Sequence, residues 1–142
     1  MYDALDVAQY AIGYEASQRR SVSNLRLQKL LYFIQAQFLV SNGRPCFHDD
    51  IEAWDFGPVV PRVYHEYKVF GSSSIPLPIR TGNYGILPDD RALINRMLDK
   101  CAQYSTTTLV SMTHNQKPWR DAYRRRFDNT ITNQDMLAFF GG

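Results

Sequence analysis

Apolar residues recur three and four positions apart along most of this chain, and that spacing is typical of amphipathic helices. A first helix is expected to begin after Asp3, whose carboxylate suits the N-cap position, and to end between Ser17 and Arg20. Further helices are expected to begin near Pro61, Asp89, Ser105 or Thr106, Pro118 and Thr132.

The segment 24–42 is apolar on two faces, with Ser23 or Asn24 as its N-cap and Gly43 after its end. A helix that is apolar on two faces packs on both of them. We therefore predict a mainly α fold, a single compact helical domain around a central buried helix at 24–42. The two apolar arcs consist of Leu27, Leu30, Leu31, Ile34 and Phe38, and of Leu25, Tyr32, Ala36 and Leu39.

Two segments carry extended or turn signals. Residues 51–54 are expected as a short strand or an extended lead-in, and the prolines that follow push Gly57 and Val60 away from helical geometry. Residues 75–80 and 84–87 predict a small β-hairpin across Thr81-Gly82-Asn83, with a flexible loop as the alternative.

Composition narrows the class of protein. The 142 residues, 44% of them apolar, suit one domain over 1–142. The longest apolar run, Leu30–Ile34, is far too short to span a membrane, and the acidic N-terminus is unlike a secretory signal. We expect a cytoplasmic protein with no membrane contact, in which Cys46 and Cys101 are free thiols. No cofactor or metal is expected, because the two cysteines and three histidines have unrelated spacings.

His114 is the most plausible single candidate for catalysis. A general base needs a nucleophile and an orienting partner, and Ser111 and Asp121 are near it in sequence without any pattern that fixes their geometry. The alternative is a hydrogen-bonding histidine at the turn before Pro118. We therefore predict that the chain is not an enzyme and has no catalytic residue.

The charged clusters are weak signals. Asp49, Asp50, Glu52 and Asp55 lack the spacing of a calcium loop and are expected to form a solvated rim. The net charge is only +2, which argues against nucleic acid as a partner. A nucleic-acid-binding regulator of a prophage or mobile element stays as the alternative function, because four arginines cluster near the C-terminal end, namely Arg120, Arg124, Arg125 and Arg126.

Four groups of residues together resemble one known family. They are Leu27-Gln28-Lys29-Leu30-Leu31-Tyr32-Phe33; Gly43, Pro45 and Phe47; Ile51-Glu52-Ala53-Trp54 with Phe56-Gly57-Pro58-Val59-Val60-Pro61 and Tyr64; and Leu109, Thr113-His114 and Pro118-Trp119. In these motifs the chain resembles the phage-associated Panacea domain, also called SocA-like, over nearly its whole length.

The resemblance implies an antitoxin that neutralises a cognate toxin by direct protein contact, and in some members delivers it to an ATP-dependent protease. It implies no catalytic residue, and its shared motif residues define the fold. Those residues are Leu27, Gln28, Lys29, Leu30, Tyr32, Trp54, Gly57, Pro58, Val59, Pro61, His114, Pro118 and Trp119.

The segment from Trp54 to Pro61 combines aromatic residues with a glycine and two prolines, which hold its path rigid. Such a turn anchors a large aromatic in the core, and we expect this of Trp54. It also suits partner binding, since a few aromatic and arginine residues carry most of the energy of an interface. The partner-binding residues expected here are Phe56, Pro58 and Tyr64, with Arg120 and Arg124 as a charged rim.

Overall fold

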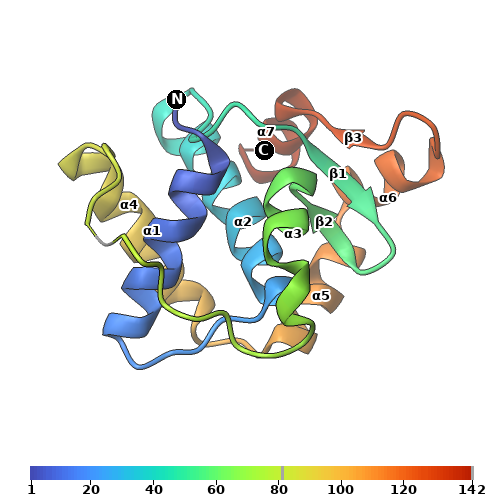
Figure 1. Ribbon diagram of the computed structural model, residues 1–142. Coiled ribbons are helices and arrows are strands. Elements are labelled where there is room, and N and C mark those ends of the chain that lie inside the picture. Colours follow the sequence, from blue (N-terminus) through green and yellow to red (C-terminus); the bar gives the residue numbers. More distant parts are fainter. Residues whose placement is uncertain (81, 142) are drawn as a thin grey trace.

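The computed structural model describes residues 1–80 and 82–141, and their fold is mainly helical, as predicted (Figure 1). A small antiparallel sheet accompanies the helices. The helices are α1 (Ala4–Ser17), α2 (Asn24–Asn42), α3 (Pro61–Tyr67) followed by the 3-10 turn η1 (Lys68–Phe70), α4 (Pro88–Cys101), α5 (Thr106–His114), α6 (Lys117–Arg124) and α7 (Asn133–Gly141). The strands are β1 (Ile51–Trp54), β2 (Gly57–Val59) and β3 (Thr130–Ile131).

Short-range capping contacts set the helix boundaries that the sequence predicts. The side chains of Asp3 and Ser23 accept hydrogen bonds from backbone amides in the first turns of α1 and α2. Ser105 does the same for α5. Gly43 ends α2 in the left-handed conformation, with φ at +67°, which a glycine adopts without a steric penalty.

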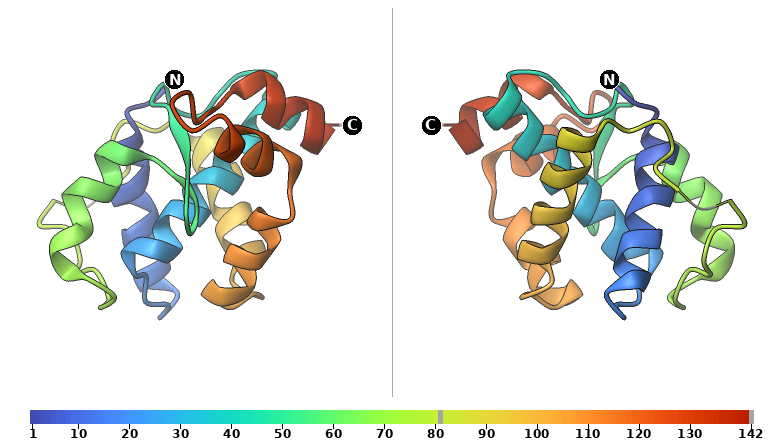
Figure 2. Two further views of the ribbon diagram at one scale, coloured as in Figure 1. Left: turned by 90° about the vertical axis from the view of Figure 1, so that its right-hand side faces the viewer. Right: turned by 90° about the vertical axis from the view of Figure 1, so that its left-hand side faces the viewer.

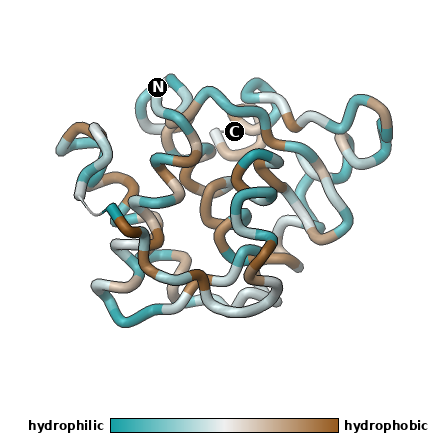
Figure 3. Tube along the Cα trace, viewed as in Figure 1, coloured by the Kyte–Doolittle hydropathy of each residue, from teal (hydrophilic) through white to brown (hydrophobic). Residues whose placement is uncertain are grey.

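Helix α2 is the centre of the fold. It contacts α1, α3, α4, α5, α7 and β2, and most of its side chains are buried. Figure 2 shows α3 and α5 on opposite sides of it, and Figure 3 shows hydrophobic positions concentrated along it. The prediction of a helix packed on both faces is confirmed.

Two buried glutamines of α2 connect it to the loops that follow. The side-chain oxygen of Gln35 accepts hydrogen bonds from the amides of Cys46 and Phe47. The side-chain oxygen of Gln28 accepts one from the amide of Val60, at 2.9 Å. Buried side-chain amides stabilise a fold when their hydrogen bonds are made. These contacts therefore fix the path of the chain just before β1 and just after β2.

The sheet has the order β2-β1-β3, and both pairs are antiparallel. Trp54 pairs with Gly57 across a two-residue turn, and Ile51 pairs with Ile131. Residues 51–54 thus form a strand, one of the two conformations expected for them.

Residues 75–80 and 84–87 do not form the expected β-hairpin, so this prediction is wrong for the residues that the structure describes. Thr81, which belonged to the predicted turn, lies outside the described residues. Pro76 and Pro78 have no N–H to donate to a strand partner. The amide of Ile75 instead donates to Val22, and that of Ile86 to Asn83.

Among residues 1–80 and 82–141, no helix combines the length and the apolar character that crossing a membrane requires.

Candidate functional site

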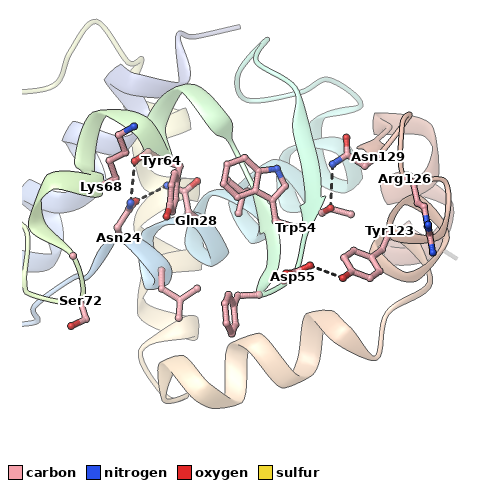
Figure 4. A pocket seen from close by; sticks show the side chains of 15 residues that line it. Asn24, Gln28, Trp54, Asp55, Tyr64, Lys68, Ser72, Tyr123, Arg126 and Asn129 are labelled. Carbon is pink, nitrogen blue, oxygen red and sulfur yellow. Dashed lines mark hydrogen bonds between the residues drawn. The ribbon is translucent and has the colours of Figure 1, made fainter.

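A cavity of about 830 Å³ opens beside the β1–β2 hairpin (Figure 4). Its volume lies in the range of small-molecule and anchor-residue pockets. Four parts of the chain form its walls: the start of α2, the hairpin, α3 with the turn after it, and residues 123–129, here called the 123–129 segment. The lining residues are Asn24, Leu25, Gln28, Ala53, Trp54, Asp55, Phe56, Val59, Tyr64, Lys68, Gly71, Ser72, Tyr123, Arg126 and Asn129.

The hairpin wall rests on a buried lysine. The side-chain nitrogen of Lys29 donates a hydrogen bond to the carbonyl oxygen of Pro58 at 2.9 Å, and burial lowers the pKa of Lys29 to about 7. Gly57 lies directly above, with φ at +112°. A Cβ atom there would be 2.6 Å from Cε of Lys29 and 2.9 Å from the hydroxyl of Thr113. Only glycine fits this position without displacement of its neighbours.

Trp54 is held on both sides. Its indole nitrogen donates to Glu52 at 3.0 Å, and its ring meets Tyr64 edge to face with the ring centres 5.0 Å apart. Its carbonyl oxygen accepts a hydrogen bond from the indole of Trp119 at 2.9 Å. Trp54 is half-buried rather than enclosed in the core, because it packs on Tyr64 and also lines the cavity.

The 123–129 segment is attached to the hairpin by hydrogen bonds. The hydroxyl of Tyr123 donates to the carboxylate of Asp55, and this bond raises the pKa of Tyr123. The backbone of Asn129 accepts from the amide of Ala53 at 2.8 Å. Arg125 donates to the backbone carbonyls of Asp128 and of Thr130, the first residue of β3. The wall formed by this segment is therefore fixed to β1.

Two basic side chains lie at opposite ends of the cavity, Lys68 on the side of α3 and Arg126 on the side of α6 (Figure 4). Within the described part of the chain, neither takes part in an ion pair. The one acidic lining residue, Asp55, already accepts the hydrogen bond from Tyr123. The cavity thus has an aromatic middle and unpaired positive charge at its ends.

The structure brings together two of the five expected partner-binding residues. Phe56, with 68% of its surface exposed, and the half-buried Tyr64 both line the cavity. Pro58 is buried, and its role is to hold the turn through its carbonyl oxygen. Arg120 and Arg124 are exposed on α6 and do not line the cavity.

Several lining residues escaped the sequence analysis. Arg126 belonged to a recognised arginine cluster, so a signal for it existed. Asn24 was considered only as a helix N-cap and Lys68 was not singled out, so neither residue was associated with the hairpin. Ser72 and Asn129 lie in turns and carry no signal that separates them from other turn residues.

His114 does not line this cavity. Its ring packs against Trp119 with the ring centres 4.3 Å apart, and its buried Nε2 makes no hydrogen bond in the described structure. Asp121, the partner considered for catalysis, forms an ion pair with Lys117. The carboxylate of Asp121 is therefore engaged by Lys117 and does not orient the ring of His114.

The acidic residues of the loop and hairpin are separated by their contacts. Asp49 accepts from the amide of Ala4 and pairs with Arg62, while Glu52 accepts from Trp54. Across residues 1–80 and 82–141, no three histidine, cysteine or acidic side chains gather closely enough to hold a metal ion.

Comparison with known proteins identifies the family. The family described as "Antitoxin SocA-like, Panacea domain" matches residues 27–120, which include most of the central helix, the hairpin and the first half of α6. The chain belongs to this family. It is also 37% identical, over 128 aligned residues, to a protein of Caulobacter vibrioides (strain NA1000 / CB15N) named Antitoxin SocA; the match covers 82% of this chain and 68% of that protein.

No solved structure matches the chain significantly.

Proposed function

We propose that this chain is the antitoxin of a toxin–antitoxin pair and neutralises a cognate toxin by direct binding, without catalysis of its own. Family membership and the name of the Caulobacter relative support the antitoxin role. The cavity beside the hairpin carries the proposal that binding is direct, because exposed Phe56 and half-buried Trp54 and Tyr64 offer the aromatic anchors typical of protein interfaces.

A stable inhibitory contact buries about 800 Å² on each partner, which is more than the cavity alone provides. The contact then extends over the hairpin and the 123–129 segment around it. Neutralisation proceeds in the cytoplasm of a bacterium, by masking the toxin or by delivery of the toxin to an ATP-dependent protease. The same proposal includes that the gene for this chain belongs to a prophage, as the family resemblance implies.

The test is co-expression of this chain with the protein encoded beside it. The neighbour is expected to stop growth alone, and co-expression is expected to restore growth. Phe56→Ala should abolish rescue while the free energy of unfolding stays nearly constant, because the side chain is exposed. Phe139→Ala, which removes another exposed phenylalanine on α7, is the matched control and should still rescue.

A harmless neighbour, or one that stays lethal in the presence of this chain, contradicts the antitoxin proposal. Rescue by Phe56→Ala at the wild-type level contradicts only the assignment of this face. The half-life of the toxin, measured with and without this chain, separates the two routes: masking leaves it unchanged, and delivery to a protease shortens it.

Nucleic-acid binding finds less support in the same region. Arg125 is engaged with backbone carbonyls, and Lys117 is paired with Asp121. Arg120 and Arg124 are exposed, but they are few for binding that depends on phosphate contacts. Retention of labelled DNA on a filter at low salt would restore this alternative.

A further inference from the structure

We infer that the cavity beside the hairpin receives an acidic segment of a partner protein: an apolar side chain enters between Trp54, Phe56 and Tyr64, and neighbouring carboxylates reach Lys68 and Arg126. The inference rests on the proposed function in that the natural source of the segment is the toxin. It adds the chemistry by which the segment is recognised.

The middle of the cavity selects an apolar group. Trp54 and Tyr64 present aromatic surface, and Leu25 of α2 and Val59 of β2 add aliphatic surface. The amides at this place are already used: Gln28 donates to Asn24 at 2.9 Å and accepts from Val60. A side chain that enters here therefore gains mainly apolar contact.

The ends of the cavity select negative charge. Lys68 and Arg126 lie on opposite sides of the aromatic middle, as Figure 4 shows, and both are exposed. They have no ion-pair partner within residues 1–80 and 82–141, so a carboxylate can bind either one without the loss of an existing pair. Hydrogen bonds between such cations and a carboxylate are stronger than neutral ones.

The same charges favour a protein segment over a nucleic acid. The cavity offers two bases, whereas each phosphate of a nucleic-acid strand carries a charge that needs compensation. Asp55 lies in the lining between those bases and repels a continuous phosphate backbone. A peptide can place isolated carboxylates at the two ends and avoid Asp55.

The experiment is a selection from a displayed library of short random peptides on the purified chain at low ionic strength. Enriched peptides are expected to carry an aromatic or large aliphatic residue with Asp or Glu nearby, in excess over the input library. The double variant Lys68→Gln, Arg126→Asn should lower their affinity about three- to tenfold, the range expected for two exposed ion pairs. Asn at 126 tolerates the positive φ of that residue, which is 56°.

The matched control is the pair Arg96→Gln, Lys100→Gln on α4, which removes the same amount of charge at exposed positions away from the cavity and from the 123–129 segment. It should leave the peptide affinity unchanged, and so should Phe139→Ala, while Phe56→Ala should lower it. Added salt should weaken binding to the wild type much more than binding to the Lys68, Arg126 variant, because salt screens exposed charges.

Failure to enrich any peptide, enrichment without an excess of acidic residues, or unchanged affinity for the Lys68, Arg126 variant overturns the inference. If DNA or RNA binds the wild type and not this variant, the occupant of the cavity is a nucleic acid and not a peptide. The co-expression assay separates this inference from the proposed function. If acidic peptides bind at the cavity but co-expression gives no rescue, the docking site is supported and the antitoxin role is contradicted. If co-expression gives rescue but the selected peptides show no acidic preference, the antitoxin role is supported and the acidic segment is contradicted.

Discussion

The side-chain nitrogen of Lys29 donates a hydrogen bond to the carbonyl oxygen of Pro58 at 2.9 Å, from a fully buried position beneath the hairpin turn. A buried lysine without a carboxylate partner is costly in its charged form, and its pKa falls to about 7. The turn that shapes the cavity is thus supported by a group that the fold prefers neutral.

This relationship predicts a pH dependence of stability. The pKa of Lys29 is about 7 in the folded state, against an ordinary value of 10.5 in the unfolded chain. Between these values the unfolded state binds the extra proton, so the free energy of unfolding contributed by Lys29 rises with pH, by on the order of 1 kcal/mol per pH unit. Below pH 7 this contribution is constant.

Urea unfolding at several pH values from 7 to 8.5 measures the effect. Lys29→Met should lose this rise, and the difference between wild type and variant removes the contribution of the other titrating groups. Equal slopes for the two proteins would show that Lys29 stays charged in the fold.

Gly57→Ala should destabilise the fold by about 2 kcal/mol or more, because the new methyl group meets Lys29 and the backbone must hold a positive φ. Gly13→Ala is the matched control: Gly13 lies within α1 and has open space around its Cβ position. That change should be neutral or stabilise by up to about 1 kcal/mol. Chemical denaturation of both variants measures the contrast, and similar effects would contradict the described close approach.

Trp119→Phe should cost about 1 kcal/mol, because the carbonyl oxygen of Trp54 loses its indole donor while the aromatic ring stays in place. Equilibrium unfolding in urea gives the value. Peptide binding should weaken at the same time, since the hydrogen bond holds the Trp54 wall. A loss of stability with unchanged binding would separate the Trp119 contact from the site.

Cys46 and Cys101 should react with a thiol reagent more than about 100-fold more slowly in the native protein than in denaturant, because reaction requires opening of the fold. Both are free and buried. Burial raises the pKa of Cys101 to about 11 and that of Cys46 further, so thiolate is scarce at neutral pH. Rapid native labelling of either thiol at pH 8 would contradict the described burial.

The helical part of the fold could be predicted because its signals are local. Ser23 and Gly43 mark the ends of α2 within the sequence itself, and the two apolar arcs between them predict burial on both faces of the helix. The same holds for Asp3 and Ser105 at other helix starts.

The sheet could be predicted only in part. Residues 51–54 carried a strand signal, but Thr130–Ile131 is too short to show any periodicity, and its pairing with β1 depends on the packing of α6. The pattern at residues 75–80 favoured a hairpin, but Pro76 and Pro78 have no N–H to donate to a strand partner, and this outweighed the pattern.

The aromatic turn beside the cavity was singled out from the sequence, whereas the charged residues at the two ends of the cavity were not. Phe56 and Tyr64 lie within one motif and line the cavity. Lys68 lies in the 3-10 turn that follows α3 and Arg126 lies just beyond α6, and no local pattern connects them. Sequence reasoning selected Arg120 and Arg124 from the arginine cluster, whereas the arginine that lines the cavity, Arg126, lies just beyond the end of α6.

The walls of the cavity come from segments as distant as Asn24 and Asn129. During synthesis, the central helix and the hairpin leave the ribosome well before the 123–129 segment does. A nascent chain that stalls between them can collapse around α2 yet lacks the wall that completes the cavity. The cavity is therefore completed late in translation, and the proposed partner segment can bind only a chain that has been synthesised through Asn129.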